Sequence, residues 1–379
     1  MKIERIEVLP VRLPLKALAR LSRGVPRTME EGKRVVLVKM IADDGTVGWG
    51  EAGPSRRWSA ETTESCYTSI KNYLAPVLVG RDPFDIAGLH AAMNTELAPG
   101  LDPGQPVAKA ALDLAAHDLI CKSLGITLQG WLGAKPRDRI ELSYLVSAPD
   151  VEGVLQSVQV GLKEGYRAFK VKVGHEPRLD IERVRAVLGL AKDCVVWADA
   201  NQGYTLDEAL RAARGFEALG IELFEQPIPM AEFYGMKKLL SATKMTIALD
   251  EAAMGLPVVI ELIRREAVEA LVIKVNKVGG IHYARQLCDL ARSAGLGLIG
   301  SGLMDAPIGF AASVHLFAAY AIDYPCDLNG PQHIAEDYLK TPLPREGRFA
   351  LVPKEPGLGV EIDEAKVKSF ALDLKGELK

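Results

Sequence analysis

Five short apolar runs in the middle of this chain of 379 residues contain or end in an ionisable residue. Each run has the length and composition of a buried strand. Ionised groups are costly to bury unless they meet one another or a metal ion, so we expect these side chains to meet in one site. The residues are Lys170, Lys172, Asp199, Glu225, Asp250 and Lys274.

The three carboxylates offer only oxygen ligands, which suit a hard cation such as Mg²⁺ and do not suit zinc. We therefore predict a Mg²⁺ site formed by Asp199, Glu225 and Asp250, with Mn²⁺ as a substitute. Three protein ligands leave room for water and for a substrate carboxylate. A cation placed there stabilises the extra negative charge of an enolate by several kcal/mol.

The lysines come from both sides of the carboxylates in the sequence, so we expect them to flank a substrate that lies on the metal. An ordinary lysine has a pKa near 10.4, whereas a useful base needs a pKa of about 7–8. The like charge of Lys170 and the metal should both lower the pKa of Lys172. Abstraction of a proton next to a substrate carboxylate is the predicted chemistry.

A carboxylate after a strand is often only the N-cap of the next helix. Asp199 does not fit that role, because Thr205 and Glu208 form a capping box for the helix that follows. Asp250 lies too far before Leu256-Pro257, where its helix should begin. A single lysine at a strand end is often a solvated surface charge, but six such groups on consecutive strands favour a site.

The elements that must position these residues repeat evenly. Anchor residues at successive run ends, from Lys172 to Gly300, lie 24 to 27 residues apart. The pattern predicts a (β/α) barrel, in which functional residues gather at the carboxyl ends of the strands. A doubly wound sheet stays open, because spacing alone does not prove closure. The apolar runs are 141–146, 168–173, 195–199, 221–225, 246–250, 271–275 and 296–300.

The first 125 residues have a different pattern of apolar and polar residues. Residues 3–8 and 34–40 alternate like antiparallel strands, and Asp43 to Thr46 form a turn signal. A long helix includes 108–115 and should stop at Gly125. Strands followed by helices predict a separate α+β domain. From Arg348 onward, the sequence predicts a segment that lies outside the barrel.

Composition excludes several classes of partner. The 46 basic and 49 acidic residues leave a formal charge of −3, so there is no basic excess for nucleic acid. The longest uncharged run, 306–322, is shorter than a membrane span and predicts a buried helix. Five cysteines without a CxxC pair, and no apolar leader in 1–24, favour a reducing cytoplasm.

At these residues the chain resembles the enolase superfamily, specifically its muconate lactonizing enzyme subgroup. Phe169 to Gly174 resemble the KxK strand, in which the resemblance makes Lys172 the acid/base and Lys170 its assistant. The segments around Asp199, Glu225 and Asp250 resemble the metal-ligand strands, and Lys274 resembles the lysine of the opposite face.

The resemblance implies a modified TIM barrel, (β/α)7β, with an α+β capping domain that the C-terminal segment completes. The implied boundaries are 1–127 for the capping domain, 128–345 for the barrel and 346–379 for the segment that returns to the cap. Barrels of this kind commonly associate, so a homo-oligomer is expected.

The resemblance also implies which residues select the substrate. Two capping-domain loops would suit an anionic substrate: 16–30, with Arg20, Arg23 and Arg27, and 54–62, with Arg56, Arg57 and Trp58. Asp305 stands where the family usually has Glu. Asp327 and Asn329 approximate the Asp-x-Asp of dipeptide epimerases, with one charge lost. Further substrate-binding or supporting candidates are Asn201, Gln226 and Glu251.

We therefore expect an isomerase acting on a small carboxylate. Cycloisomerisation of a muconate-type diacid and racemisation or epimerisation of an amino-acid derivative are close alternatives. Acid dehydration and an o-succinylbenzoate synthase-like lyase reaction are less favoured alternatives. Two different classes are a Schiff-base aldolase using Lys172 or Lys274, which leaves the carboxylates unexplained, and a non-catalytic binding relative.

Overall fold

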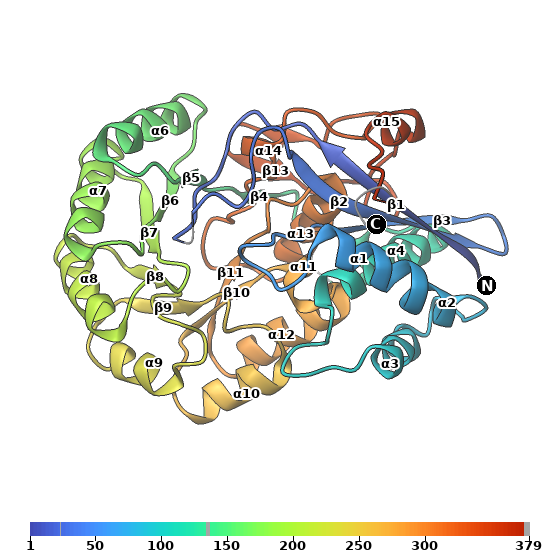
Figure 1. Cartoon of the computed structure of the whole chain (residues 1–379), viewed down its shortest axis with the longest axis horizontal. Helices are drawn as coiled ribbons and strands as arrows, with labels where there is room; N and C mark the ends of the chain where they lie inside the picture. Colours follow the sequence, from blue (N-terminus) through green and yellow to red (C-terminus); the bar gives the residue numbers. More distant parts are fainter. Residues whose placement is uncertain (23, 134–136, 375–379) are drawn as a thin grey trace.

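The computed structural model describes residues 1–22, 24–133 and 137–374, so Arg23 lies outside the described residues. The N-terminal part begins with an antiparallel sheet in the order β1-β2-β3, seen at the right of Figure 1. The turn at Asp43–Thr46 joins its second and third strands, as predicted. The strands are β1 (Ile3–Leu13), β2 (Lys33–Ala42) and β3 (Val47–Ala52).

Helices cover one face of this sheet, and α4 makes the closest approach. Gly48 and Gly50 of β3 permit it, because a Cβ on either residue would lie about 2 Å from a carbonyl oxygen of α4. The helix ends at Gly125, in the left-handed conformation, as the sequence predicts. The elements are α1 (Thr63–Ser69), the π-helix η1 (Ile70–Leu74), α2 (Ala75–Leu78), α3 (Ile86–Glu96) and α4 (Pro106–Leu124).

The predicted barrel is confirmed. Seven strands pair in parallel in chain order, and residues 326–327 close the ring by bridging Ser301 on one side and Leu142 on the other. This closure excludes the doubly wound alternative. The strands are β5 (Tyr144–Val146), β6 (Ala168–Lys172), β7 (Val195–Asp199), β8 (Leu223–Glu225), β9 (Thr246–Leu249), β10 (Ala270–Ile273) and β11 (Gly297–Gly300).

Helices surround the barrel at the left of Figure 1. The Thr205–Glu208 capping box and the helix start at Leu256 are both confirmed. The helices are α5 (Leu128–Trp131), α6 (Val151–Lys163), α7 (Pro177–Leu190), α8 (Leu206–Ala218), α9 (Phe233–Leu240), α10 (Leu256–Arg264), α11 (Val275–Val278), α12 (Ile281–Ser293), α13 (Pro307–Ala319) and α14 (Gly330–His333).

The sequence predicted that the run 141–146 forms a single barrel strand, and this prediction is wrong. Its first part belongs to β4 (Arg139–Glu141), which pairs with β13 (Phe349–Leu351) in a small antiparallel sheet with β12 (Arg345–Glu346). Only Tyr144–Val146 joins the barrel. The cause is tertiary, since the partner of Glu141 lies about 200 residues further along the chain.

The C-terminal segment returns to the capping domain, as Figure 1 shows for α15 (Glu364–Ser369) beside β1. Ala371 bridges Val11, and the backbone N–H of Leu372 donates to the carbonyl oxygen of Pro10. Lys39 and Glu364 form an ion pair with 2.6 Å between Nζ and Oε1. These contacts complete the sheet side of the cap with residues from the far end of the chain.

Buried carboxylates of the capping domain hold it on the barrel. Glu51 of β3 accepts hydrogen bonds from the backbone N–H groups of Ala306 and Gly309 at the start of α13. Asp113 of α4 likewise accepts from the N–H of Ile281 at the start of α12. Helix N-termini carry unpaired N–H groups and partial positive charge, so each carboxylate satisfies donors that would otherwise be buried without partners.

The uncharged run 306–322 folds as α13, whose residues are almost all buried in the protein core. Across the residues that the structure describes, no helix is both long enough and apolar enough to cross a membrane.

His315 of α13 should make folding stability depend on pH. Its Nδ1 accepts from the N–H of Gln129, and its Nε2 lies 3.2 Å from the carbonyl oxygen of Leu358, so the neutral ring satisfies both contacts. Burial lowers the pKa of His315 to about 4. In the unfolded state the histidine has a pKa near 6.5, so as the pH falls the unfolded state binds the proton first. The free energy of unfolding therefore decreases below about pH 6.5, and His315 should account for a decrease of about 2 kcal/mol at pH 5.

Urea denaturation at pH 7 and pH 5 measures how much unfolding free energy is lost between the two values. We expect this loss to be about 2 kcal/mol smaller in His315→Gln than in the wild-type protein. His175→Gln is the comparison and should change the pH dependence less, because the more exposed His175 side chain has its pKa lowered less by burial. An unchanged pH dependence in His315→Gln would show that this histidine is not held neutral.

Candidate active site

Strand alternation places the predicted site inside the barrel mouth. Apolar side chains of alternate residues, including Ala168, Trp197 and Leu223, form a buried cluster within the barrel. Two residues further along each of the strands β6 to β10, the inward position is taken by an ionisable residue. The structure therefore brings all six predicted residues together at the carboxyl ends of β6 to β10, and all six are buried.

Lys170 is the central cation of this group. Its Nζ lies 2.7 Å from Glu225, 2.9 Å from Asp199 and 2.9 Å from Asp327. Burial alone lowers the pKa of the Lys170 ammonium, but the three carboxylates outweigh it and raise the pKa well above its ordinary value. Lys170 thus stays charged and acts as a fixed positive charge.

The other two predicted lysines lie at opposite ends of the row of carboxylates. Lys172 Nζ lies 2.6 Å from Asp199 and donates to Asn201 Oδ1 at 2.8 Å. Lys274 Nζ lies 2.6 Å from Asp250. Burial lowers the pKa of the Lys274 ammonium, but the attraction of Asp250 outweighs burial and raises that pKa above its ordinary value.

The carboxylates repel one another. Burial, with the neighbouring charges of Asp199 and Asp250, raises the pKa of Glu225 to about 8. Burial also raises the pKa of Asp199, but Lys170 and Lys172 more than reverse this and hold it low. Within the described ranges, no three His, Cys, Asp or Glu side chains already converge closely enough to hold a metal ion. Lysine ammoniums engage the carboxylate oxygens instead.

Lys277 of α11 belongs to this site although it was not among the residues predicted from the sequence. Its buried Nζ donates to Asp250 Oδ1 at 2.9 Å and to the carbonyl oxygens of Asp250 and Val272. Asp250 is therefore held between two lysines. The signal was present, because Lys277 follows Lys274 by three residues, which is one helical turn.

Asn201 and Glu251 lie in the site, whereas Gln226 supports it from behind. Asn201 links Lys172 to Glu251, and the second carboxylate oxygen of Glu251 has no partner in the described structure. Burial, with the charges of Asp250 and Asp199, raises the pKa of Glu251 to about 7. Gln226 Oε1 accepts from the backbone N–H groups of Asp250 and Ala252, so it fixes the end of β9.

Asp327 and Asn329 lie beside the lysine cluster, whereas Asp305 is hydrogen-bonded within the barrel and feels the charge of Lys33 of the cap. Asp327 Oδ2 accepts from Lys170, and Asn329 Nδ2 donates to Asp327 Oδ1 at 3.3 Å. Asp305 accepts from Asn276 at 3.0 Å, and its buried carboxyl has its pKa raised by burial. Among the described residues, Asp305 forms no hydrogen bond or ion pair with the six charged residues.

The second capping loop covers the site. The ring of Trp58 lies 4.2 Å from Lys274 Nζ, a cation–π contact between the cap and the barrel. Beyond it lies a cavity of about 680 Å³ whose lining includes Arg57, Gln202, Glu251 and Lys277. Arg57 and Trp58 thus line the same cavity as Glu251 and Lys277 of the charged cluster, and their contact with a substrate stays a prediction.

Comparison with known families identifies both parts of the chain. Residues 10–133 match the family model described as mandelate racemase / muconate lactonizing enzyme, N-terminal domain. Residues 154–366 match the model described as enolase C-terminal domain-like. These two matches agree with the capping domain and barrel of the fold.

Curated relatives have different activities at the same level of similarity. A chloromuconate cycloisomerase of Cupriavidus necator is 30% identical and aligns with 98% of this chain and 99% of its own. An N-succinyl-L-Arg/Lys racemase of Bacillus cereus is 29% identical over 98% of both chains. The crystal structure of 2-chloromuconate cycloisomerase from Rhodococcus opacus 1CP has a TM-score of 0.92, 29% identity and coverage of 98% and 100%.

Removal of Lys170 should destabilise the fold. In Lys170→Met, three buried carboxylates lose the ammonium that compensates them, which costs about 3–5 kcal/mol for a buried pair. We expect a loss of this size in the free energy of unfolding at pH 7, measured by urea denaturation in EDTA. Lys237→Met, which breaks an exposed ion pair, should change little. A small loss in Lys170→Met would contradict the compensating role.

Proposed function

This chain belongs to the mandelate racemase / muconate lactonizing enzyme family, and we propose that it is a Mg²⁺-dependent isomerase that moves the α-proton of a small carboxylate substrate. The single observation that carries the proposal is the position of Lys172 and Lys274. They lie at opposite ends of a row of three buried carboxylates, within 2.6 Å of Asp199 and Asp250 respectively.

The residues fit a hard divalent cation by their chemistry. Asp199, Glu225 and Asp250 supply oxygen only, and their mutual repulsion is evident from the raised pKa of Glu225. A bound cation supplies positive charge that relieves this repulsion and stabilises the negative charge that develops on the substrate when its α-proton leaves. Mn²⁺ should substitute, since it prefers the same ligands.

The lysines then have separate roles. Lys172 and Lys274 exchange a proton with the substrate α-carbon from its two faces. Asn201 orients Lys172 through its 2.8 Å hydrogen bond, and Trp58 limits the movement of Lys274. Lys170 keeps its proton, because three carboxylates surround it.

Charge balance supports a cation together with an anionic substrate. The described cluster contains five carboxylates and four lysines; the carboxylates are Asp199, Glu225, Asp250, Glu251 and Asp327, and the lysines are Lys170, Lys172, Lys274 and Lys277. With every group ionised, a divalent cation and one substrate carboxylate bring the site to neutrality. Neutrality minimises the cost of burying the cluster.

Two isomerisations remain close alternatives. Racemisation or epimerisation of an amino-acid derivative uses both lysines, whereas cycloisomerisation of a muconate-type diacid requires proton delivery by one. The relatives include a cycloisomerase and a racemase at nearly equal identity, so they support both. We also propose a homo-oligomer in the cytoplasm, with the domain boundaries at 127/128 and 345/346.

Chelation should reversibly abolish the activity. We expect EDTA to stop incorporation of solvent deuterium into the substrate α-carbon, and Mg²⁺ or Mn²⁺ to restore it. Glu225→Gln should weaken Mg²⁺ binding by at least about tenfold in calorimetry, because one charged oxygen ligand is lost. Glu232→Gln is the control, since Glu232 lies outside the charged cluster. Unchanged Mg²⁺ affinity in Glu225→Gln would contradict the ligand assignment.

The two lysines can be separated by single variants. Lys172→Ala and Lys274→Ala should each abolish racemisation, a loss of at least about 10²–10⁴-fold for a lost acid/base. Each variant should still exchange the α-proton of one enantiomer, and the two should prefer opposite enantiomers, as measured by proton NMR in D₂O. With a cycloisomerase substrate, only one of the two variants should be inactive.

Equal residual activity of both lysine variants toward both enantiomers would contradict the two-base assignment. Borohydride trapping of substrate on either lysine, with activity that survives EDTA, would instead support a Schiff-base enzyme. Failure of N-acyl amino acids, dipeptides and muconates to react with Mg²⁺ present would favour a non-catalytic binding relative.

A further inference from the structure

Asp180, in the first turn of α7, is a buried carboxylate that binds the chain directly after β6. Its Oδ2 accepts hydrogen bonds from the backbone N–H groups of Gly174 and His175, each at 3.0 Å. Gly174 lies only two residues after Lys172. Asp180 is not needed to cap its own helix, because the side chain of Glu176 accepts from two N–H groups of the first turn.

The same carboxylate also binds the loop that follows β7. The buried hydroxyl of Tyr204 donates to Asp180 Oδ2. Burial and the charge of Asp180 raise the pKa of the Tyr204 hydroxyl, so Tyr204 keeps its proton and stays a donor. Tyr204 lies three residues after Asn201, the hydrogen-bond partner of Lys172. One carboxylate oxygen therefore joins the loop that follows Lys172 to the loop that contains Asn201.

Arg183 extends this connection to a third loop. Its Nη2 donates to Asp180 Oδ1, and its Nη1 donates to the carbonyl oxygen of Ala148 at 2.7 Å, in the loop that follows β5. The side chains of Arg183 and Asp180 are only 5% and 1% exposed. A pair so deeply buried is costly to break, because the remaining partner keeps a charge without compensation. The pair therefore holds together the chain segments after β5, β6 and β7.

Two glycines let the loops after β6 and β7 pack directly against each other. A Cβ on Gly174 would lie 2.4 Å from the carbonyl oxygen of Ala200, and a Cβ on Gly203 would lie 2.2 Å from the carbonyl oxygen of Gly174. Gly174 also has a φ of +100°, which favours glycine. Because the two backbones are in contact, a displacement of one loop must displace the other.

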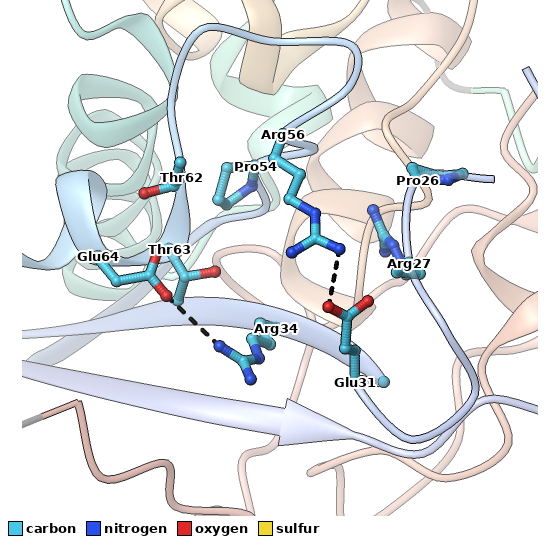
Figure 2. A pocket seen from close by; sticks show the side chains of 10 residues that line it. Pro26, Arg27, Glu31, Arg34, Pro54, Arg56, Thr62, Thr63 and Glu64 are labelled. Carbon is cyan, nitrogen blue, oxygen red and sulfur yellow. Dashed lines mark hydrogen bonds and ion pairs between the residues drawn. The ribbon is translucent and has the colours of Figure 1, made fainter. Parts of the chain in front are cut away.

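The ion pairs on the surface of the capping domain are of a different kind. Figure 2 shows Arg56 paired with Glu31 at 2.7 Å and Arg34 paired with Glu64 at 3.4 Å. Both partners of each pair belong to the cap, and their side chains are 28% to 55% exposed. Exposed pairs contribute little to stability, so these pairs offer a control for the buried one.

We propose that Asp180 is a positioning residue for Lys172: it holds the ends of β6 and β7 so that Lys172 Nζ keeps its 2.8 Å hydrogen bond to Asn201. This inference rests on the proposed function, in which Lys172 and Lys274 exchange a proton on opposite faces of the substrate α-carbon. Three strands, β7 to β9, separate β6 from β10 in the sheet. Asp180 should therefore act on Lys172 and leave Lys274 in place.

Separate measurements on two enantiomers distinguish this role from a general effect on folding. We would measure kcat and KM for exchange of the α-proton of N-succinyl-L-arginine and N-succinyl-D-arginine, by proton NMR in D₂O with Mg²⁺. Asp180→Asn keeps the size of the side chain but places an amide donor where Arg183 or the backbone N–H groups need an acceptor.

The expected result is selective for one enantiomer. In Asp180→Asn, kcat should fall about 10- to 100-fold for the enantiomer that Lys274→Ala still exchanges, because a misplacement of about 1 Å has an effect of this size. The kcat for the other enantiomer, and both KM values, should change by less than about threefold, since distant sites act independently.

Three further variants complete the test. Tyr204→Phe removes one hydrogen bond and should show the same selectivity with a smaller loss, which keeps the proposal testable if Asp180→Asn does not fold. Glu64→Gln breaks an exposed pair of Figure 2, and Asp118→Asn alters a buried carboxylate of α4 that accepts from two backbone N–H groups. Neither control should discriminate between the enantiomers. An equal loss for both enantiomers in Asp180→Asn, or no loss in either Asp180→Asn or Tyr204→Phe, would overturn the proposal.

Crystal structures of wild type and variants with Mg²⁺ test the positioning role without any reaction. Lys172 Nζ should move by about 1 Å or more in Asp180→Asn, and Lys274 Nζ should move less. An unmoved Lys172 would overturn the positioning role. If wild-type protein exchanges neither enantiomer, the proposed racemisation fails for these compounds, and the position of Lys172 in the crystals still decides the role of Asp180.

Discussion

The mutual repulsion of buried carboxylates at the barrel mouth is the constraint on which this structure depends. Glu225 shows it most clearly, because burial and the neighbouring charges of Asp199 and Asp250 raise its pKa to about 8. Lys170 stands among the carboxylates as a permanent countercharge, while Lys172 and Lys274 occupy the two ends. A site so charged is stable only with compensating cations, and the proposed divalent cation would meet the same need.

The cap is tied to this site by the same kind of interaction. Glu51 and Asp113 place carboxylates on the N-termini of α13 and α12, two helices of the barrel wall. Because these contacts are buried, the capping loops rest on a fixed base. Trp58 reaches Lys274 from one loop, and Arg27 reaches Met304 from the other. The capping loops and the barrel therefore meet through a few defined contacts.

Much of the site was predictable because it follows from local patterns. The capping box at Thr205 and the stop at Gly125 depend on neighbouring residues, and both are confirmed. The spacing of charged strand ends predicted the barrel. Lys277 was missed although its helical spacing from Lys274 was visible, and Glu141 was assigned to the wrong sheet because its partner strand is remote in the chain.

The sequence by itself determined which residue types stand at the strand ends, and alternation along each strand then decided that they face the barrel interior. Only the tertiary structure decided the partners: that Asp305 accepts from Asn276 and that Asp327 neutralises Lys170. The physical reason is that charge compensation acts across space, between side chains whose strands and loops come together only when the barrel closes and the cap is seated on it.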